Sequence, residues 1–60
     1  MTDTERLNLI EHYQWQIFTW SMDKNKFWQI TGKFGGTQAH TSLRMAFDAA
    51  YKAQAEWAMS

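Results

Sequence analysis

The sequence contains no cysteine and no proline, and only 3 of its 60 residues are glycine. The absence of cysteine excludes disulfide bonds and thiolate zinc sites, and two histidines are too few for an ordinary structural zinc site. A chain of this length buries only about 60% of the surface that it exposes when unfolded. Its 4 Trp, 4 Phe and 2 Tyr therefore predict stabilisation by dense aromatic packing, with self-association as the alternative.

Long apolar runs are absent as well. No stretch approaches the roughly 18 apolar residues of a membrane span. The acidic start, "MTDTE", lacks the apolar segment of a secretory signal. These features predict a soluble, intracellular protein in the cytoplasm, with residues 1–60 forming a single small domain and making no contact with a membrane.

Net charge is zero, but the charges are distributed unevenly. The only basic segment is 12–44, where Lys24, Lys26, Lys33 and Arg44 outweigh Asp23. This excess is small beside the strong basic bias of nucleic-acid-binding domains. The charge distribution therefore favours a protein partner over DNA or RNA.

Two local patterns occupy the first half of the chain. "TDTE" at residues 2–5 fits a capping box and predicts a short helix over residues 3–11. Alternating apolar residues over 13–22 then predict a strand, and a change of phase at Ile17 and Phe18 indicates a bulge. Residues 23–25 follow as a predicted three-residue hairpin loop, with Asn25 in the left-handed conformation.

This loop fixes a register in which Trp20 lies opposite Trp28, and Phe18 opposite Ile30, on the face that forms the core. The adjacent glycines Gly35 and Gly36 predict a second tight turn, followed by a short strand over residues 37–40.

From Thr41 or Ser42 the apolar spacing becomes helical as far as Met59, and alanines line the inner face. Small residues let this helix approach the sheet closely, so the bulk of the core must come from the sheet. The predicted fold is α+β: a three-stranded antiparallel β-meander packed on a C-terminal α-helix, with a short N-terminal helix. Its predicted core side chains from the sheet are Phe18, Trp20, Trp28, Ile30 and Phe34.

In the same register, the opposite sheet face carries two aromatics among hydrogen-bonding side chains, which is typical of a binding surface. Either the N-terminal helix covers this face with Leu7, Leu9 and Ile10, or a partner does. The predicted partner-binding residues are Trp15, Ile17, Phe27, Gln29, Thr31 and Lys33.

A second apolar stripe lies on the side of the C-terminal helix that is expected to face water, and it comprises Met45, Ala49 and Met59. It is either a mildly apolar solvated surface or a second interface, through which a small domain gains stability by forming a homodimer.

Motifs for chemistry are nearly absent. "GKFGGT" at residues 32–37 contains the residue types of a phosphate-binding loop, but a Walker A loop needs its lysine after the second glycine. Neither histidine has a nucleophile and an orienting group nearby in a recognisable motif. We therefore expect no catalytic residues, no cofactor, no metal site and no enzymatic activity.

The segment "FWQITGKFGGTQAHTSLRMAFDAA" contains no family motif. The predicted meander and helix over residues 13–59 nevertheless resemble, in architecture, the arm-binding domains of tyrosine recombinases and the plant AP2-type domain. That resemblance implies a free sheet face presented to DNA. In size and composition the chain also resembles the small accessory proteins of bacteriophages, which often bind and block a host protein.

Taken together, these features predict a small non-enzymatic module that binds another protein, as phage accessory proteins bind or inhibit a host protein. The alternative is a DNA- or RNA-binding domain that uses the free face of the sheet. The two hypotheses differ in whether the basic residues converge on that face.

Overall fold

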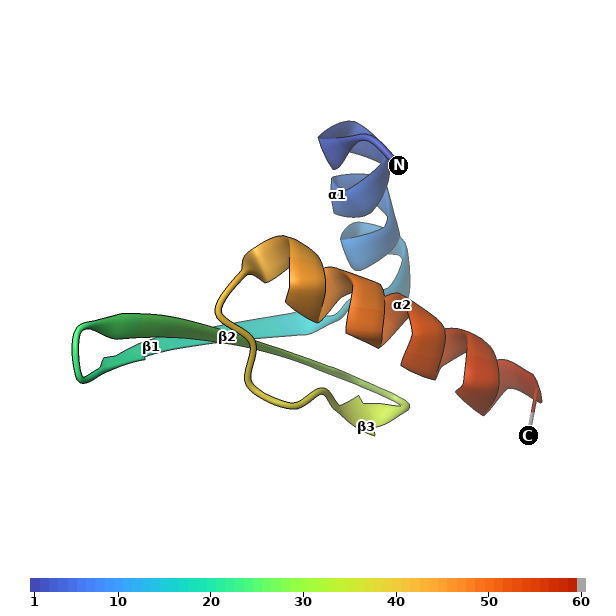
Figure 1. Ribbon diagram of the computed structural model, residues 1–60. Helices are drawn as coiled ribbons and strands as arrows, with labels where there is room; N and C mark the ends of the chain where they lie inside the picture. The colour runs from blue at the N-terminus through green and yellow to red at the C-terminus, as the bar shows by residue number, and fades with distance from the viewer. Residues whose placement is uncertain (60) are drawn as a thin grey trace.

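The computed structural model describes residues 1–59 and contains an antiparallel sheet with the strand order β1-β2-β3. Both helices lie on the same side of this sheet (Figure 1). The predicted α+β class, with a β-meander and a C-terminal helix, is confirmed. In chain order the elements are α1 (Asp3–Tyr13), β1 (Gln16–Met22), β2 (Asn25–Gly32), β3 (Gly35–Gly36) and α2 (Leu43–Met59).

Helix α1 begins at the predicted capping box. The backbone N–H of Glu5 donates to Oγ1 of Thr2 at 3.1 Å, and the Thr2 hydroxyl donates to the Glu5 carboxylate at 3.2 Å. The helix ends at Gln14, which adopts the left-handed conformation with φ 57°. This reversal lets the N–H of Trp15 donate to the carbonyl of Ile10, and it turns the Trp15 side chain back toward the helices.

The β1–β2 hairpin is closed by two residues, not by the predicted three. Asp23 and Lys24 both have positive φ, 52° and 67°, which is the conformation of the mirror-image turns that join two-residue hairpins. Met22 consequently pairs with Asn25, Trp20 with Phe27, and every residue of β1 has a partner in β2. The predicted bulge at residues 17 and 18 is therefore wrong, as is the predicted pairing of Trp20 with Trp28.

A register shift of one residue moves every side chain of one strand to the other face of the sheet. The assignments made for β2 are right, since Trp28 and Ile30 lie on the helix side. Those made for β1 are wrong, because Phe18 and Trp20 lie on the far side and Trp15 lies in the core.

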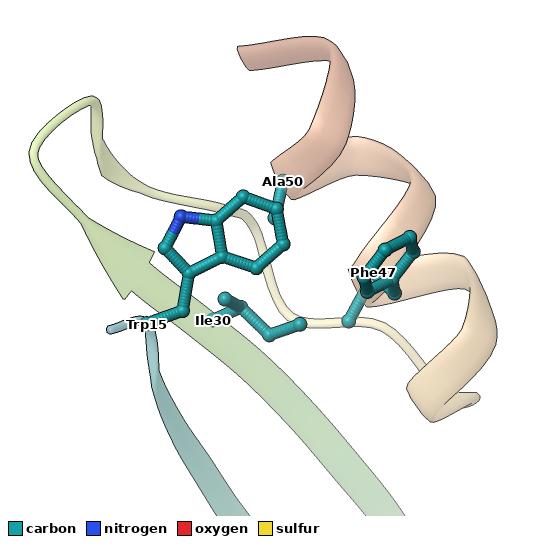
Figure 2. Packing of buried hydrophobic residues seen from close by; sticks show 5 residues of the cluster. Trp15, Ile30, Phe47 and Ala50 are labelled. Atoms are coloured by element: carbon teal, nitrogen blue, oxygen red, sulfur yellow. The ribbon is translucent and has the colours of Figure 1, made fainter. Parts of the chain in front are cut away.

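The core lies between the start of the sheet and α2. Figure 2 shows the Trp15 ring reaching from the start of β1 toward Ala50, with Ile30 of β2 and Phe47 of α2 beside it. Trp15 is 6% exposed, and its indole N–H donates to Oε1 of the buried Gln54 at 3.4 Å. A methyl group added at Gly32 would lie 2.6 Å from Cδ1 of Trp15, so a residue without a side chain is needed beneath the indole ring.

Helix α2 packs on β2 through small residues, as predicted. Ala46 and Ala50 are fully buried, and Phe47 fills the space between them and the sheet. Leu43 and Trp57, near the two ends of the helix, are exposed. Neither α2 nor α1 is long and apolar enough to cross a bilayer, and no other helix occurs in residues 1–59.

The second turn is also displaced from its prediction. It consists of Lys33 and Phe34, and the two glycines form β3, where Gly35 has φ 108°. Beyond β3, Thr37 continues the pairing: its N–H donates to the carbonyl of Ile30, and its hydroxyl oxygen accepts from the N–H of Ile30. The predicted strand over residues 37–40 is thus reduced to Thr37 and an isolated bridge between His40 and Trp28.

Candidate functional site

The face of the sheet turned away from both helices is here called the outer face. Side chains alternate along a strand, so this face takes every second residue of β1 and β2, opposite in phase to the buried Ile30. Its members are Gln16, Phe18, Trp20 and Met22 from β1, and Asn25, Phe27, Gln29 and Thr31 from β2.

An apolar cluster lies in the middle of the outer face. The rings of Trp20 and Phe27 stack across the two strands, with centroids 6.0 Å apart and planes inclined by 27°. Phe18 and Met22 flank Trp20 in β1 and are diagonal neighbours of Phe27. Phe18 is 47% exposed, Trp20 38% and Met22 58%, so large apolar side chains lie here in contact with solvent.

The hairpin carries this cluster away from the rest of the protein. In Figure 1 the ends of β1 and β2 near their turn project past the start of α2. Within residues 1–59, no helix covers either face of the sheet at this end, and the protein is elongated, with dimensions of 37 × 25 × 16 Å. A partner can therefore approach the cluster without displacing either helix.

Polar side chains border the cluster toward β3. The amide Nε2 of Gln29 donates to the carbonyl of Thr37 at 2.8 Å, which ties the outer face to the segment after β3. Thr31 lies opposite Gly36, and both Gln29 and Thr31 are half-buried. The side of the face nearer β3 is thus polar and held by hydrogen bonds, whereas the side toward the free edge of β1 is aromatic.

The outer face carries no charged side chain, and the lysines of the hairpin do not converge on it. Lys24 lies in the turn at the tip, and Lys33 lies in the turn at the opposite end of β2, where it lines a shallow hollow together with Gln16 and Thr31 at the border of the outer face. Lys26 points to the helix side, where its ammonium group lies 4.9 Å from the centre of the Trp28 ring. A face without charge next to dispersed cations lacks the means to neutralise a row of phosphates.

The residues predicted to bind a partner do not form one surface. Phe27, Gln29 and Thr31 lie on the outer face, as the predicted assignment of β2 requires. Trp15 is buried, Ile17 lies on the helix side opposite Ile30, and Lys33 lies in a turn. Phe18, Trp20 and Met22 were not among the predicted residues, because "DKN" at residues 23–25 is compatible with both a two-residue and a three-residue turn, and only the two-residue turn places them on this face.

Helix α1 covers Trp15, but not the outer face. Leu9 and Ile10 pack against the core cluster that contains Trp15, on the side of the sheet where α2 also lies, and Leu7 stays exposed. Asp3 joins α1 to α2 through a hydrogen-bonded ion pair with Arg44, at 2.9 Å. The hydrogen bond and the charge of Arg44 lower the pKa of this carboxyl below its usual 3.8, with a smaller contribution from Arg6.

The proposed second interface lies on α2. Met45 and Ala49 are one helical turn apart, with Met45 exposed and Ala49 half-buried, and the exposed Met59 ends the helix. Whether these residues contact another protein stays a prediction.

Residues 1–59 contain no group of three or more histidine or carboxylate side chains that could hold a metal ion. Comparisons with protein-family models, with curated proteins and with solved structures find no match for this chain. Only the geometry of the chain itself therefore bears on its function.

Proposed function

We propose that this protein is a small non-enzymatic binding module whose outer face contacts another protein. The observation that carries this proposal is the stacked pair of Trp20 and Phe27, which lies between Phe18 and Met22 on a face without charge. Aromatic side chains and methionine are enriched in the centres of protein interfaces, and charged side chains are depleted there.

The arrangement of the outer face supports this reading in a second way. Interfaces combine an apolar centre, which excludes water, with a polar border that fixes orientation. Here Gln16, Asn25, Gln29 and Thr31 surround the apolar cluster along the same two strands. An intracellular protein with a complementary apolar surface is the expected partner, and blocking such a host protein is the route by which phage accessory proteins often act.

Binding of DNA or RNA by the same sheet is the competing hypothesis. Nucleic-acid affinity depends largely on phosphate neutralisation, and the logarithm of the binding constant falls by about 0.9 per phosphate contact against the logarithm of salt. Lys24 and Lys33 lie in turns at opposite ends of β2, and Lys26 lies over the Trp28 ring on the helix side, so few such contacts can form at once. The protein partner is therefore the stronger candidate.

The proposal is tested by capture from a lysate of the source cell, followed by measurement of the affinity for the captured protein. Trp20→Ala should weaken binding about 30-fold, because one desolvated aromatic often contributes 2 kcal/mol or more. Trp57→Ala, an equal truncation at an exposed tryptophan of α2, serves as the matched control and should leave the affinity unchanged. Nuclease treatment and Lys33→Ala should also leave it unchanged.

Two results would overturn the proposal. One is sub-micromolar binding of DNA or RNA at physiological salt that Lys33→Ala abolishes. The other is a captured protein whose affinity falls with Trp57→Ala and is unaffected by Trp20→Ala.

A further inference from the structure

Strand β1 is an edge strand, and it lacks the features by which natural edge strands avoid pairing. Within residues 1–59 the strand order β1-β2-β3 leaves one side of β1 without a neighbour. Its sequence, "QIFTWSM", has no charged residue and no proline, and the ladder to β2 contains no bulge. Charges, prolines and bulges are the usual protection of such an edge. We propose that a second copy of this protein pairs with β1 and joins two three-stranded sheets into one.

The directions in which the backbone N–H and C=O groups of the hairpin point support this pairing. Trp28 and Ile30, two even-numbered residues of β2, direct their backbone groups to His40 and Thr37. Because this direction alternates along a strand, the odd-numbered residues of β2 face β1, where their partners are even-numbered. The odd-numbered residues of β1 therefore turn their N–H and C=O groups toward the free edge: Ile17, Thr19 and Ser21.

These outward residues are complementary to a second copy of themselves. In an antiparallel pair with its two-fold axis at Thr19, each Thr19 lies opposite the other, and Ile17 lies opposite Ser21 in both halves. Every outward N–H then meets an outward C=O, which gives about six new backbone hydrogen bonds. Such a two-fold contact uses the same surface on both copies, as closed dimers do.

The side chains of β1 are compatible with the same register. On the outer face, Phe18 of each copy lies opposite Trp20 of the other, at a position without direct backbone bonds, where side chains come closest. The stacked pair of Trp20 and Phe27 thereby extends into an aromatic row across the joined sheet. On the helix side, the opposed residues are small or uncharged, so no like charges meet along β1.

Charge complementarity appears where the paired strands end. In this register Met22 lies opposite Gln16 of the second copy, so the turn of Asp23 and Lys24 comes near the end of the second copy's α1. Gln14 caps the C-terminal end of α1, where Glu11 lies and where the helix dipole is negative. Lys24 of the turn is attracted by this negative potential, while Asp23 in the same turn and His12 in the last turn of α1 reduce the net complementarity.

The pairing is expected to be weak, because a seven-residue strand forms a small interface near or below the roughly 1,200 Å² of the smallest stable ones. We expect dissociation constants on the order of tens of micromolar. The inference does not depend on the proposed function, since it uses the edge of β1 and leaves the outer face open to a different protein.

The first test uses the unaltered chain. Sedimentation equilibrium from micromolar to millimolar concentration should show a reversible dimer, and amide hydrogen exchange is followed over the same range. Exchange at Ile17, Thr19 and Ser21 should slow at least tenfold as the dimer forms, because their N–H groups acquire partners. The N–H groups of Phe18 and Trp20, which already face β2, are the internal control and should change little.

The second test places charges on the proposed two-fold axis. Thr19→Lys and Thr19→Glu should each weaken the dimer at least tenfold, since like charges would lie directly opposite each other. An equimolar mixture of the two variants should form a heterodimer of at least the original affinity. Gln38→Lys adds the same charge at an exposed position away from the edge and should leave the dimer unchanged.

Three results would overturn the inference. The first is a strict monomer at millimolar concentration. The second is a dimer in which the outward amides of β1 exchange as fast as in dilute solution. The third is a dimer that Met45→Glu abolishes while Thr19→Lys does not, which would place the contact on α2. Capture of a partner by the Thr19→Lys variant does not require the dimer, so the proposed function and the dimer are tested separately.

Discussion

The two ends of the β1–β2 hairpin differ in what covers them. Where β1 begins, α2 packs on the sheet and α1 contributes side chains to the same core, in which Trp15 contacts Phe34 and Phe47 with ring centroids 5.8 and 5.5 Å away. At the turn of Asp23 and Lys24, neither face of the sheet meets a helix within residues 1–59. Tryptophans five positions apart in the chain therefore have different roles, since Trp15 holds the fold together and Trp20 is available to a partner.

This difference shows that aromatic content alone does not identify a core. Trp15 and Phe47 lie in the core, whereas the aromatics of β1 lie on the outer face, because only the other face of the sheet has a helix to pack against. Three sets of substitutions distinguish the covered base from the uncovered tip.

The largest effect is expected from removing the indole at the base. Trp15→Ala should lower the free energy of unfolding by about 3–5 kcal/mol, because it empties the centre of the core and leaves Gln54 without its hydrogen bond. Trp20→Ala, the same truncation at the tip, should cost about 1 kcal/mol or less. Chemical denaturation of both variants measures the difference, and equal losses would contradict the contrast.

A smaller loss is expected at Gly32, beneath the same indole. Gly32→Ala places a methyl group 2.6 Å from Trp15 Cδ1 and should destabilise the protein by about 1–3 kcal/mol through overpacking. Gly36→Ala is the control, since its added methyl group would come no closer than 3.3 Å to its nearest neighbour, the Thr31 methyl. Thermal unfolding should rank the two variants in this order. A larger loss at Gly36 would mean that Trp15 does not lie over Gly32.

The smallest effect is a gain at the tip. Lys24→Gly should stabilise the protein by up to about 1 kcal/mol, because φ at this position is 67° and glycine adopts such angles without strain. Lys26→Gly makes the same exchange inside β2, where glycine weakens a strand, and should be destabilising. If Asn25→Gly stabilised the protein and Lys24→Gly did not, the hairpin would have the three-residue loop that the sequence first suggested.

The length of this loop decides which residues of β1 face the core. Fold class, the capping box at Thr2, the alanine-lined face of α2 and the helix-facing residues of β2 were predicted correctly, since each follows from a local pattern. The face assignment of β1 was wrong because "DKN" allows either a two-residue or a three-residue turn, and the apolar pattern of β1 fits both. Apolar residues occur in both phases around β1, with Trp15 and Ile17 in one phase and the aromatics of β1 in the other, so alternation alone cannot decide which face is buried.

Only the β2 half of the outer face was therefore predicted from the sequence. The prediction placed Phe27, Gln29 and Thr31 on the face that no helix covers. It placed the β1 residues of that face in the core, and it placed Trp15 and Ile17 on the outer face instead. Only the packing of Trp15 against Gly32 and Gln54 decides between the two registers, and both contacts join residues far apart in the sequence. No local pattern contains that information.

The hydrogen bond from Trp15 to Gln54 joins residues 39 positions apart, and this separation has a consequence for folding. An isolated two-stranded hairpin is marginally stable in water, so we expect the β1–β2 hairpin to form quickly and to unfold again. It persists only once α2 has returned across the sheet and closed a long loop of chain. We therefore expect the rate-limiting step to be the arrival of α2 on Trp15 and Ile30, with the exposed tip of the hairpin as the segment that forms earliest.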